Sequence, residues 1–251
     1  MLAVGWDVGG WMGDKNAVAL ALWKDGSPVP HPCGTPCCFT LPDTLMSPLE
    51  LVRKACSTVT QTDLDRLRVV IAIDAPLGFP YAFRRLVNGT TPSSGRPKSA
   101  INSPLAYRET ERYVQRVFRR TPLSAPFDKL GNNATVAIAH MQFWRRSHWY
   151  RVPPFDAPGD HTKTAIEVYP AISGEMYIGK GAADQIKQLV PEDPPLSQHE
   201  SDAAVCAALA MAFVKGSPDG PLPPLVNPKG IEGITDGILR VEGWIYNPAK
   251  A

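Results

Sequence analysis

The sequence lacks several features that would assign it to a common class of protein. No apolar run is long enough to span a bilayer, and no basic segment followed by an apolar one opens the chain. These absences predict a cytoplasmic protein without a membrane partner. Lysine plus arginine, 26 residues, nearly balance aspartate plus glutamate, 24 residues, so net charge indicates no polyanionic partner. A nucleic-acid ligand would need a local basic patch.

Cysteine is scarce, and its five residues are an odd number, which argues against a disulfide framework. His31, Cys33, Cys37 and Cys38 lie close together, but their spacing matches no paired C-x-x-C zinc motif. We therefore expect buried or surface thiols there. The chain also has no G-x-S-x-G elbow, no Walker-type phosphate loop and no convincing Cys–His pair.

Hydrophobic patterning predicts an α/β protein. The expected strands are 2–8, 17–23, 69–73, 164–168 and 237–246, with the first two forming a hairpin. The 69–73 run is apolar on both faces, which is typical of a central strand covered by helices on each side. Expected helices are one capped by Ser47, then 107–120, 132–149, and 203–214 capped by Ser201.

The chain shows no internal repeat and no obvious linker. We therefore predict one domain over residues 1–251. Proline is abundant, at 26 residues, and much of it lies in connecting segments. A Pro/Gly-rich stretch around 88–104 has no periodicity, so we interpret it as an insertion.

Acidic residues recur where a site is expected. Asp7, Asp74 and Glu167 lie at or near the ends of predicted strands, and Asp202 lies in the first turn of the last apolar helix. Ligands of open α/β sheets bind outside the carboxyl ends of the strands. Clustered carboxylates are costly to desolvate without a cation, and ligands that are all oxygen favour Mg²⁺ or Mn²⁺. Asp7 alone could cap a turn and Asp202 could be a first-turn charge, so the prediction rests on the joint pattern.

The motifs around these acids resemble those of one family, called domain of unknown function 429. They are the segments 5–11, 73–78, 167–170 and 201–204, and the closing segment 242–245. Members of that family are described as predicted nucleases of the ribonuclease-H-like superfamily. The resemblance implies a three-layer ribonuclease-H-like fold, with a mixed central sheet and helices on both faces. It also implies that the four acids are catalytic and metal-binding residues of a metal-dependent phosphodiester hydrolase acting on DNA or RNA.

Four basic residues are candidates for contacts with a nucleic-acid substrate. Arg108 and Arg112 belong to a stripe with a basic residue at every fourth position, which could follow phosphates but is more typical of a solvated face. Arg145 opens the basic and aromatic segment 145–151, which suits base stacking or, equally, packing of Trp149 into the core. Lys163 could stabilise charge on a phosphoryl group. None of the five histidines has a compelling partner.

Two other functions stay open. The segment 7–10 also resembles the first phosphate loop of actin-like ATPases and sugar kinases, although the chain lacks their second Gly-rich loop and adenosine motif. A non-catalytic binding protein that keeps the fold is the other alternative. The sequence does not predict the oligomeric state.

Overall fold

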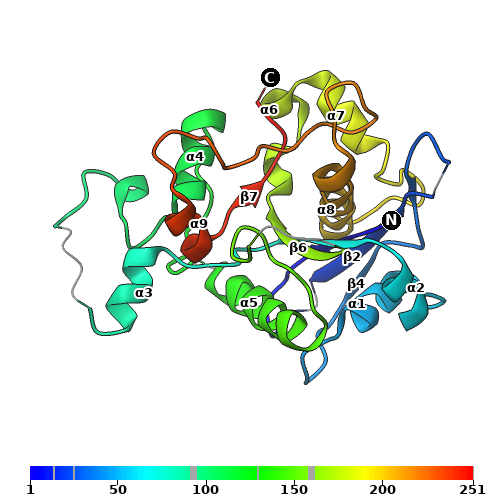
Figure 1. Ribbon diagram of the computed structural model, residues 1–251, viewed down its shortest axis with the longest axis horizontal. Coiled ribbons are helices and arrows are strands. Elements are labelled where there is room, and N and C mark those ends of the chain that lie inside the picture. Colours follow the sequence, from blue (N-terminus) through cyan, green and yellow to red (C-terminus); the bar gives the residue numbers. More distant parts are fainter. Residues whose placement is uncertain (14, 25, 91–94, 129, 158–161, 251) are drawn as a thin grey trace.

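A computed structural model describes residues 1–13, 15–24, 26–90, 95–128, 130–157 and 162–250. These residues contain a seven-stranded mixed sheet with the order β3-β2-β1-β5-β6-β7, in which β4 also pairs with β2 (Figure 1). The strands are β1 Leu2–Asp7, β2 Asn16–Leu22, β3 His31–Pro32, β4 Cys37–Phe39, β5 Val69–Asp74, β6 Lys163–Val168 and β7 Ile245–Tyr246.

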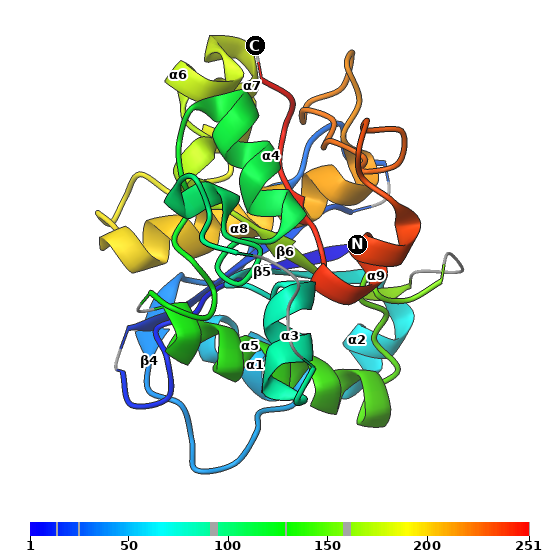
Figure 2. The same ribbon diagram turned by 90° about the vertical axis from the view of Figure 1, so that its left-hand side faces the viewer.

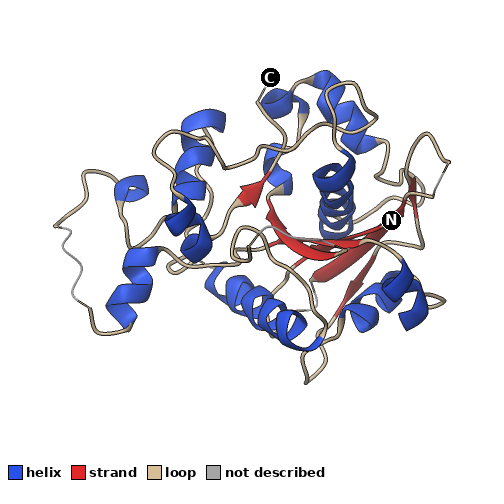
Figure 3. Cartoon of the chain, in the orientation of Figure 1, coloured by secondary structure: helices blue, strands red, loops and turns tan. Residues whose placement is uncertain are grey.

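Helices cover both faces of this sheet. In Figure 1, α8 lies on one face while α1 and α5 lie on the other, and Figure 3 shows the strands as a twisted layer between them. The α-helices are α1 Pro48–Ala55, α2 Gln61–Arg66, α3 Tyr81–Val87, α4 Glu109–Phe118, α5 Leu130–Ser147, α6 Glu175–Ile178, α7 Lys180–Lys187, α8 Gln198–Lys215 and α9 Asp236–Glu242. Short 3-10 helices are η1 Ala100–Asn102 and η2 Pro170–Ile172. The prediction of an α/β protein is confirmed.

The central strands carry the predicted pattern. β1 pairs with β2 as an antiparallel hairpin and with β5 in parallel, and β5 pairs in parallel with β6. Because side chains alternate along a strand, each strand supplies two apolar layers. Ala3 and Ala72 pack with α8 in one core, whereas Trp6 and Ile71 pack with α5 in the other. Figure 2 shows the same division, with α4, α6, α7 and α8 on one side and α1, α2, α3 and α5 on the other.

The backbone of α8 lies directly against β1 because Gly5 has no side chain. A methyl group added at Gly5 would lie 1.9 Å from the carbonyl oxygen of Ala203 and 2.4 Å from the nitrogen of Ala207. Neither backbone atom could move without displacing the helix. Gly5 therefore fixes the distance between α8 and the sheet.

The N-terminus of α8 is capped by Ser197, so the prediction of Ser201 as the cap is wrong. The Ser197 side chain accepts a hydrogen bond from the Glu200 N–H, and the Glu200 carboxylate accepts one from the Ser197 N–H. This capping box starts the helix four residues earlier than expected. Asp202 consequently lies in the second turn, one turn after His199.

Replacing Ser197 by alanine is expected to lower the free energy of unfolding by about 1 kcal/mol, because the side-chain cap at the start of α8 is lost. Chemical denaturation measures the change. Ser217, which lies just beyond the end of α8, supplies a matched serine control, and its alanine variant should unfold like the wild type. Equal losses in both variants would contradict this role of the cap.

The chain end and the insertion differ from prediction. The 237–246 segment is not one strand: α9 occupies Asp236–Glu242, capped by Thr235, and only Ile245–Tyr246 forms a strand. The predicted 107–120 helix spans Glu109–Phe118, and α3 precedes the 88–104 stretch, which contains η1. Residues 91–94 of that stretch lie outside the described residues. Within the part of the chain that the structure describes, no helix is long and apolar enough to cross a membrane.

Candidate metal and phosphodiester site

Two of the predicted acids end neighbouring strands side by side. Asp7 closes β1 and Asp74 closes β5, and the two residues are Cα partners in the parallel ladder. Adjacent strands lie about 4.8 Å apart, and partners in register point to the same face of the sheet. Both carboxylates therefore share the α8 face. They lie at the carboxyl edge of the sheet, where the sequence predicted them.

A cavity of about 150 Å³ opens at this edge. Asp7, Asp74 and Glu167 line it together with Arg108 and Glu111. Apolar side chains form much of the remaining wall: Pro122, Leu123, Leu130 and Ile245. The structure thus brings three of the four predicted acids to one cavity, while Asp202 does not line it.

The electrostatics of Asp7 and Asp74 reflect their crowding. Burial raises the pKa of Asp7 to about 6, against the lowering effect of the hydrogen bond and charge of His199. Burial and then the charges of Asp7, Asp202 and Glu167 raise the pKa of Asp74 well above its usual range. Two neighbouring carboxylates that both resist ionisation would be stabilised in the charged form by a cation.

The helix α8 brings two more side chains to these acids. Nδ1 of His199 lies 2.6 Å from Oδ2 of Asp7. The prediction that no histidine has a compelling partner is therefore wrong. Asp202 accepts hydrogen bonds from the Gln198 side chain at 2.9 and 3.0 Å, and its charge raises the pKa of both Asp7 and Asp74. His199 was missed in the sequence. The signal that could have found it is its spacing from Asp202, because residues three apart lie on one face of a helix.

Glu167 occupies a different environment, because a buried arginine binds it. Nη1 and Nη2 of Arg108 donate to the two oxygens of Glu167 at 2.8 and 2.5 Å, and the Leu77 N–H donates to the same carboxylate at 2.9 Å. The Arg108 side chain is fully buried and also pairs with Glu111. Burial raises the pKa of Glu167, and the Arg108 charge offsets part of that rise. Both interpretations of Arg108 as a surface residue are wrong.

A second buried carboxylate, missed in the sequence, joins the segments around this network. Glu242 accepts hydrogen bonds from the N–H groups of Tyr81 and Glu109 at 2.7 and 2.8 Å. Its backbone carbonyl also accepts from Nη1 of Arg108 at 2.9 Å. Glu242 therefore ties the first residues of α3 and α4 to the end of α9.

The other predicted basic residues lie away from the acidic cavity. Arg112 pairs with Glu109 and donates to the carbonyls of Ile101 and Ser103, so it anchors η1 to α4. Lys163 pairs with Asp65 at 2.6 Å. It begins β6, about 13 Å along the strand from Glu167. Arg145 pairs with Asp156 near the other end of α5.

The carboxylates of Asp7 and Asp74 are the side chains that could hold an ion at this edge of the sheet. Across the described ranges, no three side chains of histidine, cysteine, aspartate or glutamate stand close enough to hold a metal ion. Zinc sites need three or four protein ligands, whereas Mg²⁺ keeps several waters and takes one or two carboxylates plus substrate phosphates. The adjacent carboxylates of Asp7 and Asp74 fit the second description.

Comparisons with known proteins add no relative to this picture. No family model, no curated protein and no solved structure matches the chain.

Proposed function

We propose that the protein is a metal-dependent phosphodiester hydrolase of the ribonuclease-H-like type, acting on DNA or RNA. Asp7 and Asp74 would bind Mg²⁺ or Mn²⁺ directly. One observation carries the proposal: two carboxylates in register on adjacent parallel strands, both with raised pKa, line one cavity at the carboxyl edge of the sheet. The sheet order, with an antiparallel β2 beside parallel β1, β5 and β6, is consistent with it.

A bound ion would activate water for attack on phosphorus and stabilise the leaving oxygen. The residues of the chain prepare the site for that ion. His199 holds Oδ2 of Asp7 from α8 and so leaves the other oxygen of Asp7 for the ion. Asp202 adds negative charge close to both acids. The apolar walls of the cavity limit water around them.

Glu167 has a positioning role in this site rather than a metal-binding one. Its two oxygens are held by Arg108, and its hydrogen bond to Leu77 fixes the loop that follows Asp74. The 75–77 segment contributes Ala75 to the cavity wall, next to Asp74. Glu167 therefore orients the loop that directly follows the proposed metal ligand Asp74, and would join the ion only by leaving Arg108.

The test combines metal binding and cleavage. Millimolar Mn²⁺ should raise the melting temperature of the wild-type protein, because an ion that binds only the folded state stabilises it. The same ion should stimulate cleavage of a panel of single- and double-stranded DNA and RNA. Asp74→Asn should remove both effects, while Asp184→Asn, on the exposed surface of α7, should remove neither.

Negative results have distinct meanings. A wild-type protein that cleaves nothing on the panel with any divalent ion contradicts the hydrolase. If its melting temperature is also unchanged by Mg²⁺ and Mn²⁺, the result favours the alternative of a non-catalytic binding protein. Tight ATP binding in calorimetry would instead support the actin-like ATPase or sugar kinase.

A further inference from the structure

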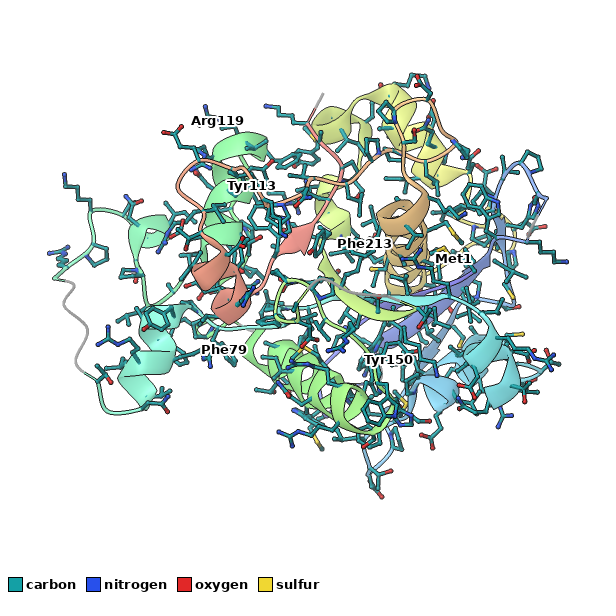
Figure 4. The ribbon with its side chains drawn as sticks, in the orientation of Figure 1. Met1, Phe79, Tyr113, Arg119, Tyr150 and Phe213 are labelled. Carbon is teal, nitrogen blue, oxygen red and sulfur yellow. The ribbon has the colours of Figure 1, made fainter. Side chains whose placement is uncertain are left out.

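A basic and aromatic groove runs beside α5, on the sheet face opposite α8. It consists of two adjoining cavities of about 430 and 320 Å³, which share Gln142 and Arg145. We call it the α5 groove. Its second cavity reaches Leu77, whose N–H binds Glu167, so the groove extends from the loop beside the acidic site toward the C-terminal end of α5. In Figure 4, Phe79 and Tyr150, one from each cavity, lie toward opposite ends of α5.

Positive charge is concentrated in this groove. Among the described residues that line it, one is an aspartate, Asp156, and five are arginines: Arg84, Arg145, Arg146, Arg151 and Arg240. Over the whole chain, by contrast, basic residues exceed acidic ones by only two. Such a local excess attracts a polyanion even though the net charge does not.

Trp149 lies at the end of the groove in an unusual position. It is 81 % exposed, so the interpretation that packs Trp149 into the core is wrong. The neighbouring Tyr150 takes that role, with its ring 6.1 Å from Trp144 and 3 % of its surface exposed. The Tyr150 N–H donates to the Trp144 carbonyl at 3.3 Å, which turns the chain back at the end of α5.

This turn puts Trp149 in the left-handed region, with φ of +60°. Helices commonly end on a left-handed residue, and glycine is the usual choice because other residues are strained there. A large apolar side chain at this position therefore adds strain and exposed surface without packing against the core. The indole face is therefore open to a ligand.

We propose that the α5 groove binds single-stranded nucleic acid, with a base stacked on Trp149 and the backbone following the arginines toward Leu77, in the loop that follows Asp74. An exposed indole beside arginines is the combination that holds unpaired bases and their phosphates. In a duplex the faces of the bases are stacked on one another and are closed to the indole. Cleavage of the bound strand rests on the proposed function, whereas binding in the α5 groove requires no metal.

The first experiment measures fluorescence anisotropy of labelled oligodeoxythymidylate and oligouridylate of about 12 nucleotides, with EDTA present to prevent cleavage. Trp149→Gly should weaken binding roughly tenfold, the loss expected for one stacked base. The same variant should melt roughly 2–4 °C above the wild type, because glycine relieves the strain of the left-handed backbone at this position. A structural role of Trp149 predicts the opposite change in melting temperature.

The second experiment varies salt. Arg146→Ala and Arg151→Ala should each reduce the slope of log affinity against log salt by about 0.7, as expected when one phosphate contact is lost. Arg116→Ala is the matched control, because Arg116 is an exposed arginine on α4, on the other side of the sheet. It should change neither affinity nor slope.

The outcomes separate this inference from the proposed function. Three results would contradict binding in the α5 groove. The first is a wild-type protein that does not bind the single-stranded probe, and the second is one that binds a duplex more tightly than the probe. The third is equal affinity of the wild type and Trp149→Gly for the probe. Binding that depends on Trp149 in a protein that cleaves nothing supports the groove and contradicts the hydrolase. Cleavage that is unaffected by Trp149→Gly supports the hydrolase and contradicts the groove.

Discussion

Replacing Asp7 by asparagine is expected to abolish Mn²⁺-stimulated cleavage and, in the same molecule, to stabilise the metal-free fold at neutral pH. Cleavage should fall at least about a hundredfold, since a lost metal ligand removes several kcal/mol of transition-state stabilisation. Stability should rise because the pKa of Asp7 increases from 3.8 to about 6 on folding. The folded protein therefore keeps a costly charge at neutral pH, equivalent to as much as about 3 kcal/mol.

The sign of the pH dependence follows from the same shift. Between about pH 6 and pH 4, the folded state takes up the Asp7 proton before the unfolded state does, so the contribution of Asp7 to the free energy of unfolding becomes more favourable as the pH falls through this window. The asparagine of the Asp7→Asn variant cannot titrate, and its side-chain oxygen can still accept from His199. Melting curves in EDTA should show a smaller gain on acidification for Asp7→Asn than for the wild type.

Two results would contradict this account of Asp7. One is an Asp7→Asn protein that melts below the wild type at neutral pH without metal, which would make the carboxylate a stabilising group. The other is full Mn²⁺-stimulated cleavage by the variant. Asp184→Asn removes one exposed acid in the same way and should change neither property.

Arg108→Ala is expected to cause the largest loss of stability, about 3–5 kcal/mol. The substitution leaves Glu111 and Glu167 buried, 1 % and 3 % exposed, without the cation that pairs with both. Breaking a buried ion pair on one side costs this much because the remaining charge stays out of water. Chemical denaturation measures the loss. Arg108→Lys should recover only part of it, since an ammonium cannot reproduce the paired bonds to Glu167.

The control for Arg108 lies one turn further along α4. Arg112→Ala removes an arginine whose side chain is 23 % exposed, and the loss should be no more than about 1 kcal/mol. If Arg108→Ala does not fold, adding Glu111→Gln should restore folding, because one uncompensated charge is removed. Equal losses for Arg108→Ala and Arg112→Ala would show that the buried network contributes little.

Local patterns predicted the frame of the molecule. The apolar runs that carry Asp7, Asp74 and Glu167 at or near their ends are β1, β5 and β6. Asp7 and Asp74 are register partners, whereas Glu167 pairs with Ile73 and so lies on the opposite face of the sheet. Ser47, Pro48 and Glu50 likewise defined the start of α1 through the spacing of a capping box. These features depend on residues that are neighbours in sequence, and so the sequence alone was sufficient.

The Arg108 network could not be predicted in the same way. A helix start with arginine and glutamates nearby has the composition of a solvated surface, and only the tertiary fold brings Glu167 and Glu242 to it. His199 was missed because its partner, Asp7, lies 192 positions earlier in the chain. Trp149 and Tyr150 are adjacent aromatic residues, and their opposite fates follow from one left-handed turn.

The contact at Gly5 fixes the position of α8 relative to β1 at the proposed site. Asp7 lies two residues beyond Gly5 on β1, while Ala203, which Gly5 touches, lies next to Asp202 and one turn after His199 on α8. The groups contributed by the strand and those contributed by the helix are thus held together by backbone meeting backbone, with no side chain between them to adjust. The spacing between Asp7 and the helical groups is set by an absent side chain, in a residue that takes no part in the chemistry.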